Sequence, residues 1–313
     1  MASTRELRRK IKSIKGTQKL TQAMQLISAA KMNKAIQKAL ASRTYSRLAW
    51  SIIGELTGRV GRDSHPLLAT RPVKKVALIV ITANRGLAGG LNAQLIRKVV
   101  ALIKERQSAG QTISVISLGR KGTQFFARHF ATELSADFPT PDTVAGYSDI
   151  LPMSGVALDQ FLAAEFDEVV VAYNEFVSTL KQAPTVRTLL PIHQMGVNSG
   201  ETSEVGLRPS SEVKEELVKT AEVSALADVV FEPDQDRVLE SLLPRAVRSQ
   251  LYQFLLDANA SEHAARMLAM KNATDNAGEL IDDLTLTMNS VRQAGITQEI
   301  SEISAGAEAL RAR

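Results

Sequence analysis

The glycine-rich segment Thr82–Asn92 has the composition of an anion-binding loop. It follows an apolar run and precedes a helical pattern, and the backbone N–H groups at a helix N-terminus attract phosphate. The segment lacks the Gly-Lys-Ser/Thr ending of a P-loop and the spacing of a dinucleotide fingerprint. We therefore interpret its glycines as structural residues that permit positive φ and close packing of strand on helix. No cofactor site is predicted here.

Other residue types that could carry catalysis are scattered. The four histidines, at positions 65, 129, 193 and 263, show no metal-ligand spacing. Asp282 and Asp283 are adjacent, so on a helix they point in different directions and are best explained as solvated side chains. The absence of cysteine excludes disulfides, zinc-thiolate sites and thiol switches. The sequence therefore predicts no catalytic, cofactor-binding or metal-binding residue, and we expect the chain not to be an enzyme itself.

Positive charge is concentrated at the start of the chain. Met1–Trp50 contains twelve Lys or Arg residues and a single acid, Glu6, within a net charge of +5 for the whole chain. A block of this kind is either a solvated face or a contact for an acidic partner. No apolar run approaches the roughly 20 residues that cross a bilayer, so we expect no direct membrane insertion.

Residues 1–60 predict one long helix. Leu7, Ile11 and Ile14, and then Leu20, Met24 and Ile27, follow steps of three and four residues. About 50 residues of helix would be about 75 Å long, which is too long for a small globule. Such a helix needs a partner along most of its length.

Residues 71–205 alternate between strand and helix patterns. Val76–Thr82 is a continuous apolar run typical of a strand that is buried on both faces. Further strands are predicted at 113–118, 168–177 and 186–192, with helices at 92–110, 124–130 and 156–166. This alternation predicts a Rossmann-like α/β domain. Residues 206–233 are interpreted as a variable polar linker.

Residues 234–313 predict a second long helix, with Pro244 marking a kink or a restart. Two sets of apolar or small residues advance in alternating steps of four and three, which is the coiled-coil period. They are Ala277, Ile281, Leu284, Met288, Val291 and Gly295, and then Ile296, Ile300, Ile303, Ala307 and Leu310. The predicted fold is therefore an α/β domain plus a long antiparallel coiled coil of the two terminal helices.

Four segments together resemble the γ-subunit family of F-type ATP synthases. Ile296–Ala309 is similar to the family signature, with Ile296, Thr297, Glu299, Glu302, Gly306 and Ala307 at its characteristic positions. Ala260–Ala277, Arg8–Met24 and the glycine-rich segment are similar to other family stretches in the same order. Ala83 and Ala88 stand where the family commonly has Asp and Cys. The resemblance is to bacterial and cyanobacterial forms, without the regulatory cysteines of the chloroplast form.

This resemblance implies a central rotor stalk that couples rotation of a membrane ring to conformational changes in catalytic β subunits. The terminal helices would form the shaft, and the α/β domain would form the foot. The implied partners are the α and β subunits, the ε subunit and the c-ring. Met24, Arg266, Gln293 and Thr297 would contact β subunits, and Glu232 would contact ε or the c-ring.

The implied location is the periphery of a membrane, on the cytoplasmic side of a bacterial inner membrane or the stromal or cytoplasmic face of a thylakoid. Two other hypotheses stay open from the residues alone. A basic coiled-coil protein that binds nucleic acid would explain the sequence pI of about 9.4, but no recognition motif or platform of aromatic residues is visible. An α/β enzyme with helical arms would need a catalytic constellation that the middle segment does not show.

Overall fold

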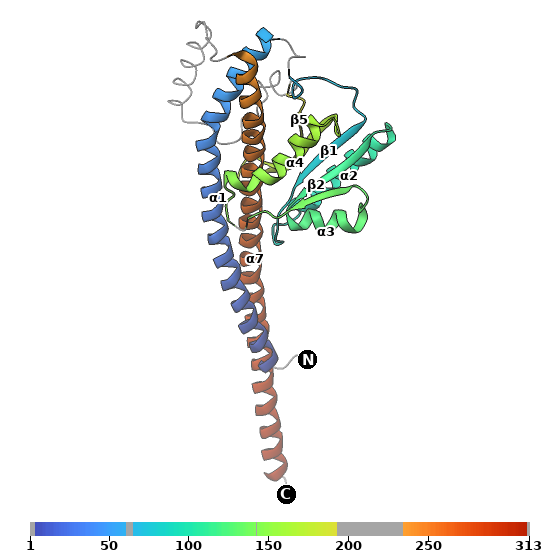
Figure 1. Cartoon of the computed structure of the whole chain (residues 1–313). Helices are drawn as coiled ribbons and strands as arrows, with labels where there is room; N and C mark the ends of the chain where they lie inside the picture. Colours follow the sequence, from blue (N-terminus) through green and yellow to red (C-terminus); the bar gives the residue numbers. More distant parts are fainter. Residues whose placement is uncertain (1–3, 61–64, 142, 193–233, 312–313) are drawn as a thin grey trace. The chain divides into compact units, whose positions relative to one another are not determined.

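The computed structural model describes residues 4–60, 65–141, 143–192 and 234–311. The first and the last described elements are two long helices, α1 (Thr4–Val60) and α7 (Gln235–Arg311) (Figure 1). Helix α7 continues through Pro244 without a restart. The chain divides into two compact units, each described by itself below: Met1–Ser28 with Met267–Arg313, and Ala29–Arg266. The predicted linker at 206–233 lies outside the described residues.

The first unit is a pair of antiparallel helical segments. The hydroxyl groups of Thr21 on α1 and Thr274 on α7 lie 2.7 Å apart, and the Gln18 side chain lies against Gly278. Residue numbers therefore rise along one helix as they fall along the other. The buried or half-buried stripe of α1 keeps a strict heptad spacing, and it consists of Leu7, Ile11, Ile14, Gln18, Thr21, Gln25 and Ser28.

This stripe corrects the predicted one. Leu20 and Ile27 are 61% and 57% exposed, and Met24 is only half-buried. The stripe was predicted from the spacing of apolar residues. After Ile14, however, the heptad positions that face α7 are occupied by polar and small residues. The apolar residues lie on a different face of α1.

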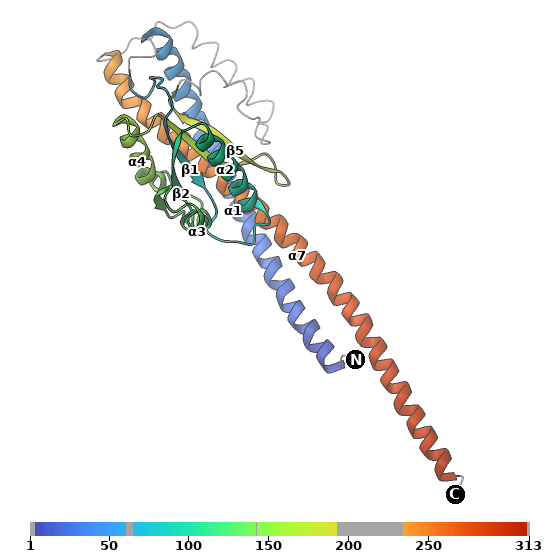
Figure 2. The same cartoon turned by 90° about the vertical axis from the view of Figure 1, so that its right-hand side faces the viewer.

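In the second unit, α1 and α7 pack through small residues. Ser42 Oγ donates to Gln253 Oε1 at 2.6 Å, and the Gln253 side-chain N–H donates to the carbonyl of Ala39 at 3.0 Å. The heptad positions of α1 from Met32 to Ile53 are buried or half-buried: Met32, Ala35, Ala39, Ser42, Ser46, Ala49 and Ile53. Alanine and serine at these positions let two helix backbones approach closely. Both views show the two helices side by side here (Figures 1 and 2).

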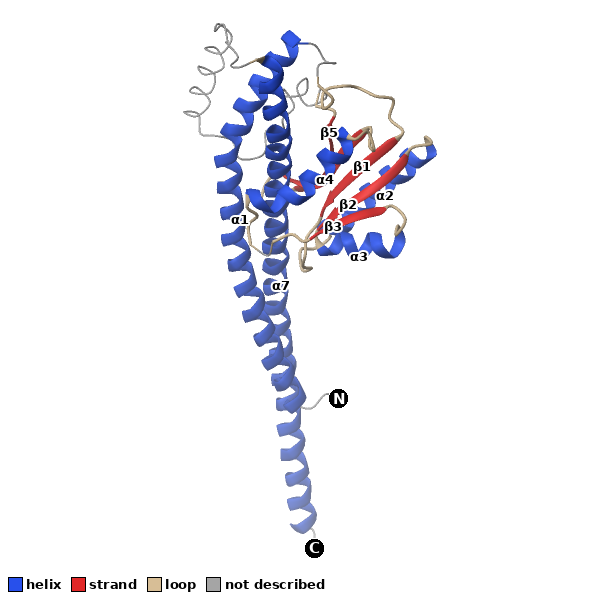
Figure 3. Cartoon of the chain, in the orientation of Figure 1, coloured by secondary structure: helices blue, strands red, loops and turns tan. Residues whose placement is uncertain are grey.

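The second unit also contains a five-stranded sheet in the order β3-β2-β1-β4-β5 (Figure 3). Its strands are β1 (Lys75–Ile81), β2 (Thr112–Leu118), β3 (Leu134–Phe138), β4 (Glu168–Phe176) and β5 (Gln182–Leu190). The neighbours β1–β2, β1–β4 and β2–β3 are parallel, and β5 pairs antiparallel with β4. The strand β3 was not predicted, because this short edge strand alternates half-buried and exposed residues and carries no apolar run.

Helices cover both faces of this sheet. On one face, α2 (Leu91–Ser108) and α3 (Arg120–His129) pack Leu95, Val99 and Phe126 onto alternate residues of β1. On the other face, α4 (Leu151–Leu162), which follows the short helix η1 (Tyr147–Ile150), packs together with α7 and Ile53 of α1. The three central strands β1, β2 and β4 are thus largely buried on both sides, as continuous apolar runs predict.

One glycine is required by this packing. Gly119 follows β2 directly and has a φ of 104°, a backbone conformation that residues with a side chain rarely adopt. A Cβ atom at this position would overlap the carbonyl group of Thr82. The Thr82 N–H donates to the carbonyl of Leu118 at 2.8 Å, so the chain after β1 lies directly against the end of β2. This contact fixes where the glycine-rich loop leaves the sheet.

Candidate functional site

The glycine-rich loop begins at the carboxyl end of β1, in the middle of the sheet. Its base is held by Asn92 at the start of α2, whose Oδ1 accepts a hydrogen bond from the Ala83 N–H at 3.1 Å. Within the loop, Gly89 takes a positive φ of 58°, as predicted for a structural glycine. Leu87 also takes a positive φ, of 63°, and its side chain is 61% exposed. A large non-glycine residue in this region of φ is strained.

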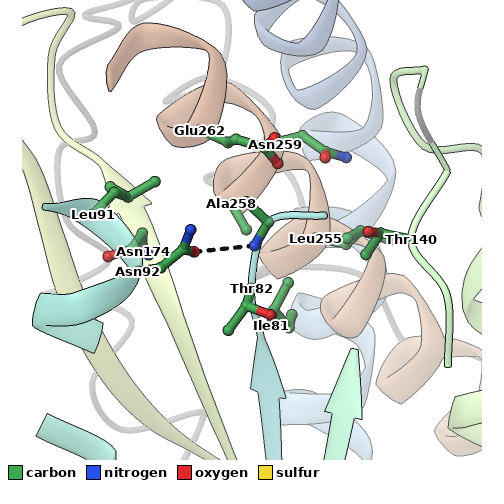
Figure 4. A pocket seen from close by; sticks show the side chains of 11 residues that line it. Ile81, Thr82, Leu91, Asn92, Thr140, Asn174, Leu255, Ala258, Asn259 and Glu262 are labelled. Atoms are coloured by element: carbon green, nitrogen blue, oxygen red, sulfur yellow. Dashed lines mark hydrogen bonds between the residues drawn. The ribbon is translucent and has the colours of Figure 1, made fainter. Parts of the chain in front are cut away.

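A small cavity lies beside the loop, and its lining residues come from β1, α2, β4 and α7 (Figure 4). This is the switch point where parallel α/β sheets commonly bind nucleotides. Here Leu255, Ala258 and Glu262 of α7 close the crevice, and about 10 Å³ remains for the centre of a water molecule. That is room for about one water. The space does not accommodate a phosphate group or a nucleotide, so the loop serves the structure.

Arg266 of α7 makes several hydrogen bonds beside this loop. Its Nη2 donates to Glu262 Oε1 at 2.6 Å and to the carbonyl of Arg85 at 3.5 Å, and its Nε donates to the carbonyl of Gly86 at 3.3 Å. The Arg266 residue is 8% exposed. A guanidinium group is always charged, so its burial is possible because the Glu262 carboxylate balances it.

His263 is the third side chain of the hydrogen-bonded group that contains Arg266 and Glu262. Its Nδ1 lies 3.3 Å from Nη1 of Arg266. Arginine has donors only, so Nδ1 accepts the hydrogen bond and the neutral imidazole carries its proton on Nε2. Burial, followed by the positive charges of Arg266 and Lys31, lowers the pKa of His263 to about 4. Both features keep this histidine neutral near pH 7.

The residues that the resemblance assigned to partner contacts lie in different environments. Gln293 and Thr297 are exposed, one helical turn apart on α7, and Thr297 Oγ1 donates to the carbonyl of Gln293 at 2.9 Å. Met24 is half-buried on α1. Arg266 belongs to the other unit and is bonded within the chain. Glu232 lies outside the described residues.

Sequence reasoning missed Glu262, the two loop carbonyls and the role of His263. One signal was available, because Glu262 and Arg266 are four residues apart and therefore neighbours on a helix. The carbonyl acceptors had no signal, since any residue type provides them. Among the described residues, no group of three or more His, Asp or Glu side chains is arranged to hold a metal ion. In the same part of the chain, no helix is long and apolar enough to cross a membrane.

Comparisons with known proteins agree over nearly the whole chain. A family model described as ATP synthase matches residues 3–310. The ATP synthase gamma chain of Roseiflexus castenholzii is 44% identical over 312 residues, which cover 99% of both chains. The gamma chain of Herpetosiphon aurantiacus is 43% identical over 318 residues, again covering 99% of both.

Solved structures support the fold. A chain from the Euglena gracilis mitochondrial ATP synthase structure of OSCP, F1 and c-ring matches with a TM-score of 0.62 and 17% identity. The match covers 99% of this chain and 95% of that one. A chain from the central stalk and c-ring of the Tetrahymena thermophila enzyme matches with a TM-score of 0.57 and 21% identity, covering 81% of this chain and 99% of that one.

Proposed function

This chain belongs to the ATP synthase γ-chain family, and from that premise we propose which of its surfaces carry rotation to the partner subunits. It is a non-catalytic subunit of the peripheral F1 sector and a central-stalk rotor. The alternative of a nucleic-acid-binding protein finds no support among the matches. In the proposal, the partners are the α and β subunits, the ε subunit and the c-ring.

The observation that carries the proposal is the exposed end of α7. Every residue from Arg292 to Ala307 is exposed, although the heptad pattern continues through it. The side chains of Ile296, Ile300 and Ile303 are 49%, 59% and 72% exposed. A row of isoleucines without an intrachain partner is typical of a surface that another protein covers. We assign that cover to the α and β subunits.

The earlier heptad set behaves differently. Ile281 is buried, and Leu284, Met288 and Val291 are half-buried against α1 in the first unit. The coiled coil within the chain thus uses the first apolar set of α7. The second set is left for a partner, which explains why both sets are apolar.

The proposed β-subunit contacts are Met24, Arg266, Gln293 and Thr297. Gln293 and Thr297 flank the isoleucine row and offer hydrogen-bonding groups without fixed charge, which suits a contact that must be made and broken during rotation. Met24 is an unbranched apolar side chain that can slide over a partner. Next to it, Leu20 and Ile27 extend the exposed apolar surface of α1.

The α/β sheet is proposed as the foot of the shaft, which rests on ε and the c-ring. Glu232 is proposed as a polar contact there. The proposed location is the cytoplasmic side of a bacterial inner membrane, or the equivalent face of a thylakoid. In this arrangement each face of the shaft favours one conformation of β, so a turn of the shaft changes which conformation is populated.

ATPase assays on matched α and β subunits, mixed with and without this chain, test the proposal. We expect no hydrolysis by the chain alone, a stable α3β3γ complex, and weaker activity when Arg292–Arg311 is deleted. A chain that never joins the α and β subunits, or that hydrolyses ATP alone, would refute the rotor function. Salt-dependent binding to DNA without assembly would instead favour the nucleic-acid alternative.

A further inference from the structure

We propose that Glu262, His263 and Arg266 form a clamp within the chain that holds the Arg85–Leu87 tip of the glycine-rich loop against α7, with Glu262 as the residue that positions the guanidinium group. This loop clamp goes beyond the rotor function, because it needs no partner subunit. It assigns to Arg266 a task inside the second unit.

The hydrogen-bond inventory of Arg266 is the first support. A guanidinium group has five N–H donors. One is directed to Gly86, two to Glu262 and Arg85, and one to His263. Four of the five donors are therefore engaged within the chain. One N–H remains for a partner, so a two-pronged contact with a partner carboxylate requires the clamp to open.

The conformation of the loop tip is the second, independent support. Leu87 is held at a φ of 63° with its side chain exposed, and such a backbone conformation is unfavourable for a residue other than glycine. The carbonyls that precede it are bonded to Arg266. The residue that follows it, Ala88, is buried against Leu91 and against Ala265 of α7. Leu87 is thus fixed from both sides, and α7 contributes to both attachments.

Glu262 has a distinct part in this arrangement. Its carboxylate makes the shortest of the contacts, 2.6 Å, with an Arg266 side chain that is largely buried. Without this negative charge, the guanidinium group would gain by turning toward water, and the two carbonyls would lose their donor. Glu262 does not contact the loop carbonyls, so it acts on the loop through Arg266.

The sequence supplies a protease site at the place where the clamp acts. Trypsin cleaves after arginine and needs the local backbone to open, and the Arg85 carbonyl is one of the acceptors of Arg266. The exposed turn at Lys181, between β4 and β5, provides a reference site on the same chain. Cleavage at the Arg85–Gly86 bond, relative to the Lys181–Gln182 bond, therefore reports on the clamp.

The experiment compares cleavage rates at both bonds by mass spectrometry in the full chain and its variants. Glu262→Gln keeps the shape of the side chain but removes its negative charge. Arg266→Lys keeps the positive charge but removes the planar guanidinium group with its several donors. We expect about tenfold faster cleavage after Arg85 in each variant, unchanged cleavage after Lys181, and little additional effect when both substitutions are combined. Glu302→Gln is the matched control, since Glu302 also accepts a hydrogen bond from a residue four positions away but is exposed.

Two outcomes would overturn the proposal. One is an unchanged rate after Arg85 in both variants. The other is an equal rise at both bonds, which would indicate general loosening of the second unit. Because no α or β subunit is present, this result is independent of the rotor assay. The clamp proposal can be refuted while the rotor function holds, and the rotor function can be refuted while the clamp proposal holds.

Discussion

Ser46 on α1 and Ser249 on α7 face each other across the helix pair of the second unit, with their hydroxyl oxygens 2.8 Å apart in a buried contact. A buried hydroxyl group is costly unless it is hydrogen-bonded, so this pair favours one register of the two helices over its neighbours. Ser42 and Gln253 repeat the arrangement one turn away. A seam of alanines alone could slide by a turn at little cost. The polar pairs make such a shift unfavourable.

Close packing of this seam predicts intolerance to larger side chains. Ala39 is 2% exposed, and its carbonyl accepts a hydrogen bond from Gln253. Ala39→Leu should lower the free energy of unfolding of the full chain by about 1–3 kcal/mol, because the helices must separate. Ala41→Leu, at an exposed position two residues away, should change it little. Denaturant unfolding followed by helical circular dichroism measures both, and equal effects would contradict the close seam.

The turn at the end of β2 predicts a strong requirement for glycine. Gly119→Ala forces both a rare φ and an overlap with the Thr82 carbonyl, so we expect a loss of about 2 kcal/mol or more. Gly155→Ala is the contrasting control, because this helical glycine of α4 has nothing near its missing Cβ. There the change should be neutral or stabilising by up to about 1 kcal/mol. We expect a lower denaturation midpoint for Gly119→Ala than for Gly155→Ala. The reverse order would contradict the requirement for glycine at position 119.

The lowered pKa of His263 predicts a dependence of stability on pH. Between the folded pKa of about 4 and the unfolded value of 6.5, the unfolded chain binds a proton that the folded chain does not. Stability from this group is therefore complete above pH 6.5 and is lost as the pH falls through 4, by up to roughly 3 kcal/mol. His263→Gln should flatten this part of the profile. An unchanged slope of unfolding free energy against pH between 4 and 6.5 would contradict the assignment.

The exposed end of α7 predicts a loss of coupling without a loss of folding. Replacing Gln293 and Thr297 together by alanine should lower ATP hydrolysis by the α3β3γ complex several-fold, because the proposed contacts with β would be removed. The melting temperature of the free chain should stay the same, since both side chains are exposed. Thr287→Ala is a matched control: Thr287 is also exposed and also bonds the carbonyl four residues earlier. A similar loss in the control would argue against a specific contact.

The large helices and strands could be predicted from the sequence because burial leaves a pattern of apolar residues in each of them. The part of the run from Val76 to Ile81 is apolar at every position, and β1 is indeed buried on both faces there. The buried stripe of α1 was predicted only as far as Ile14. Beyond it, the helix pair is held by close approach and hydroxyl contacts, as between Thr21 and Thr274, and these leave no hydrophobic pattern.

The candidate site was harder to predict for a related reason. The acceptors that the loop clamp binds in the loop are the backbone carbonyls of Arg85 and Gly86, which residue types do not encode. The positive φ at Leu87 was also hidden, because the three glycines of the segment were the expected carriers of that conformation. The proposed contact residues follow from family resemblance, and their assignment to β subunits stays a prediction.

The unpaired end of α7 has a thermodynamic consequence for assembly. Arg292–Arg311 is about 30 Å of helix at 1.5 Å per residue, and Arg292–Ala307 has no buried residue. A single helix of this length is only marginally stable in water. Its last turns should therefore unwind and reform in the free chain, and enclosing them inside a complex requires a loss of conformational entropy. That loss offsets part of the attraction of the exposed isoleucines. The shaft end can then be tightly surrounded and still bind weakly enough to turn.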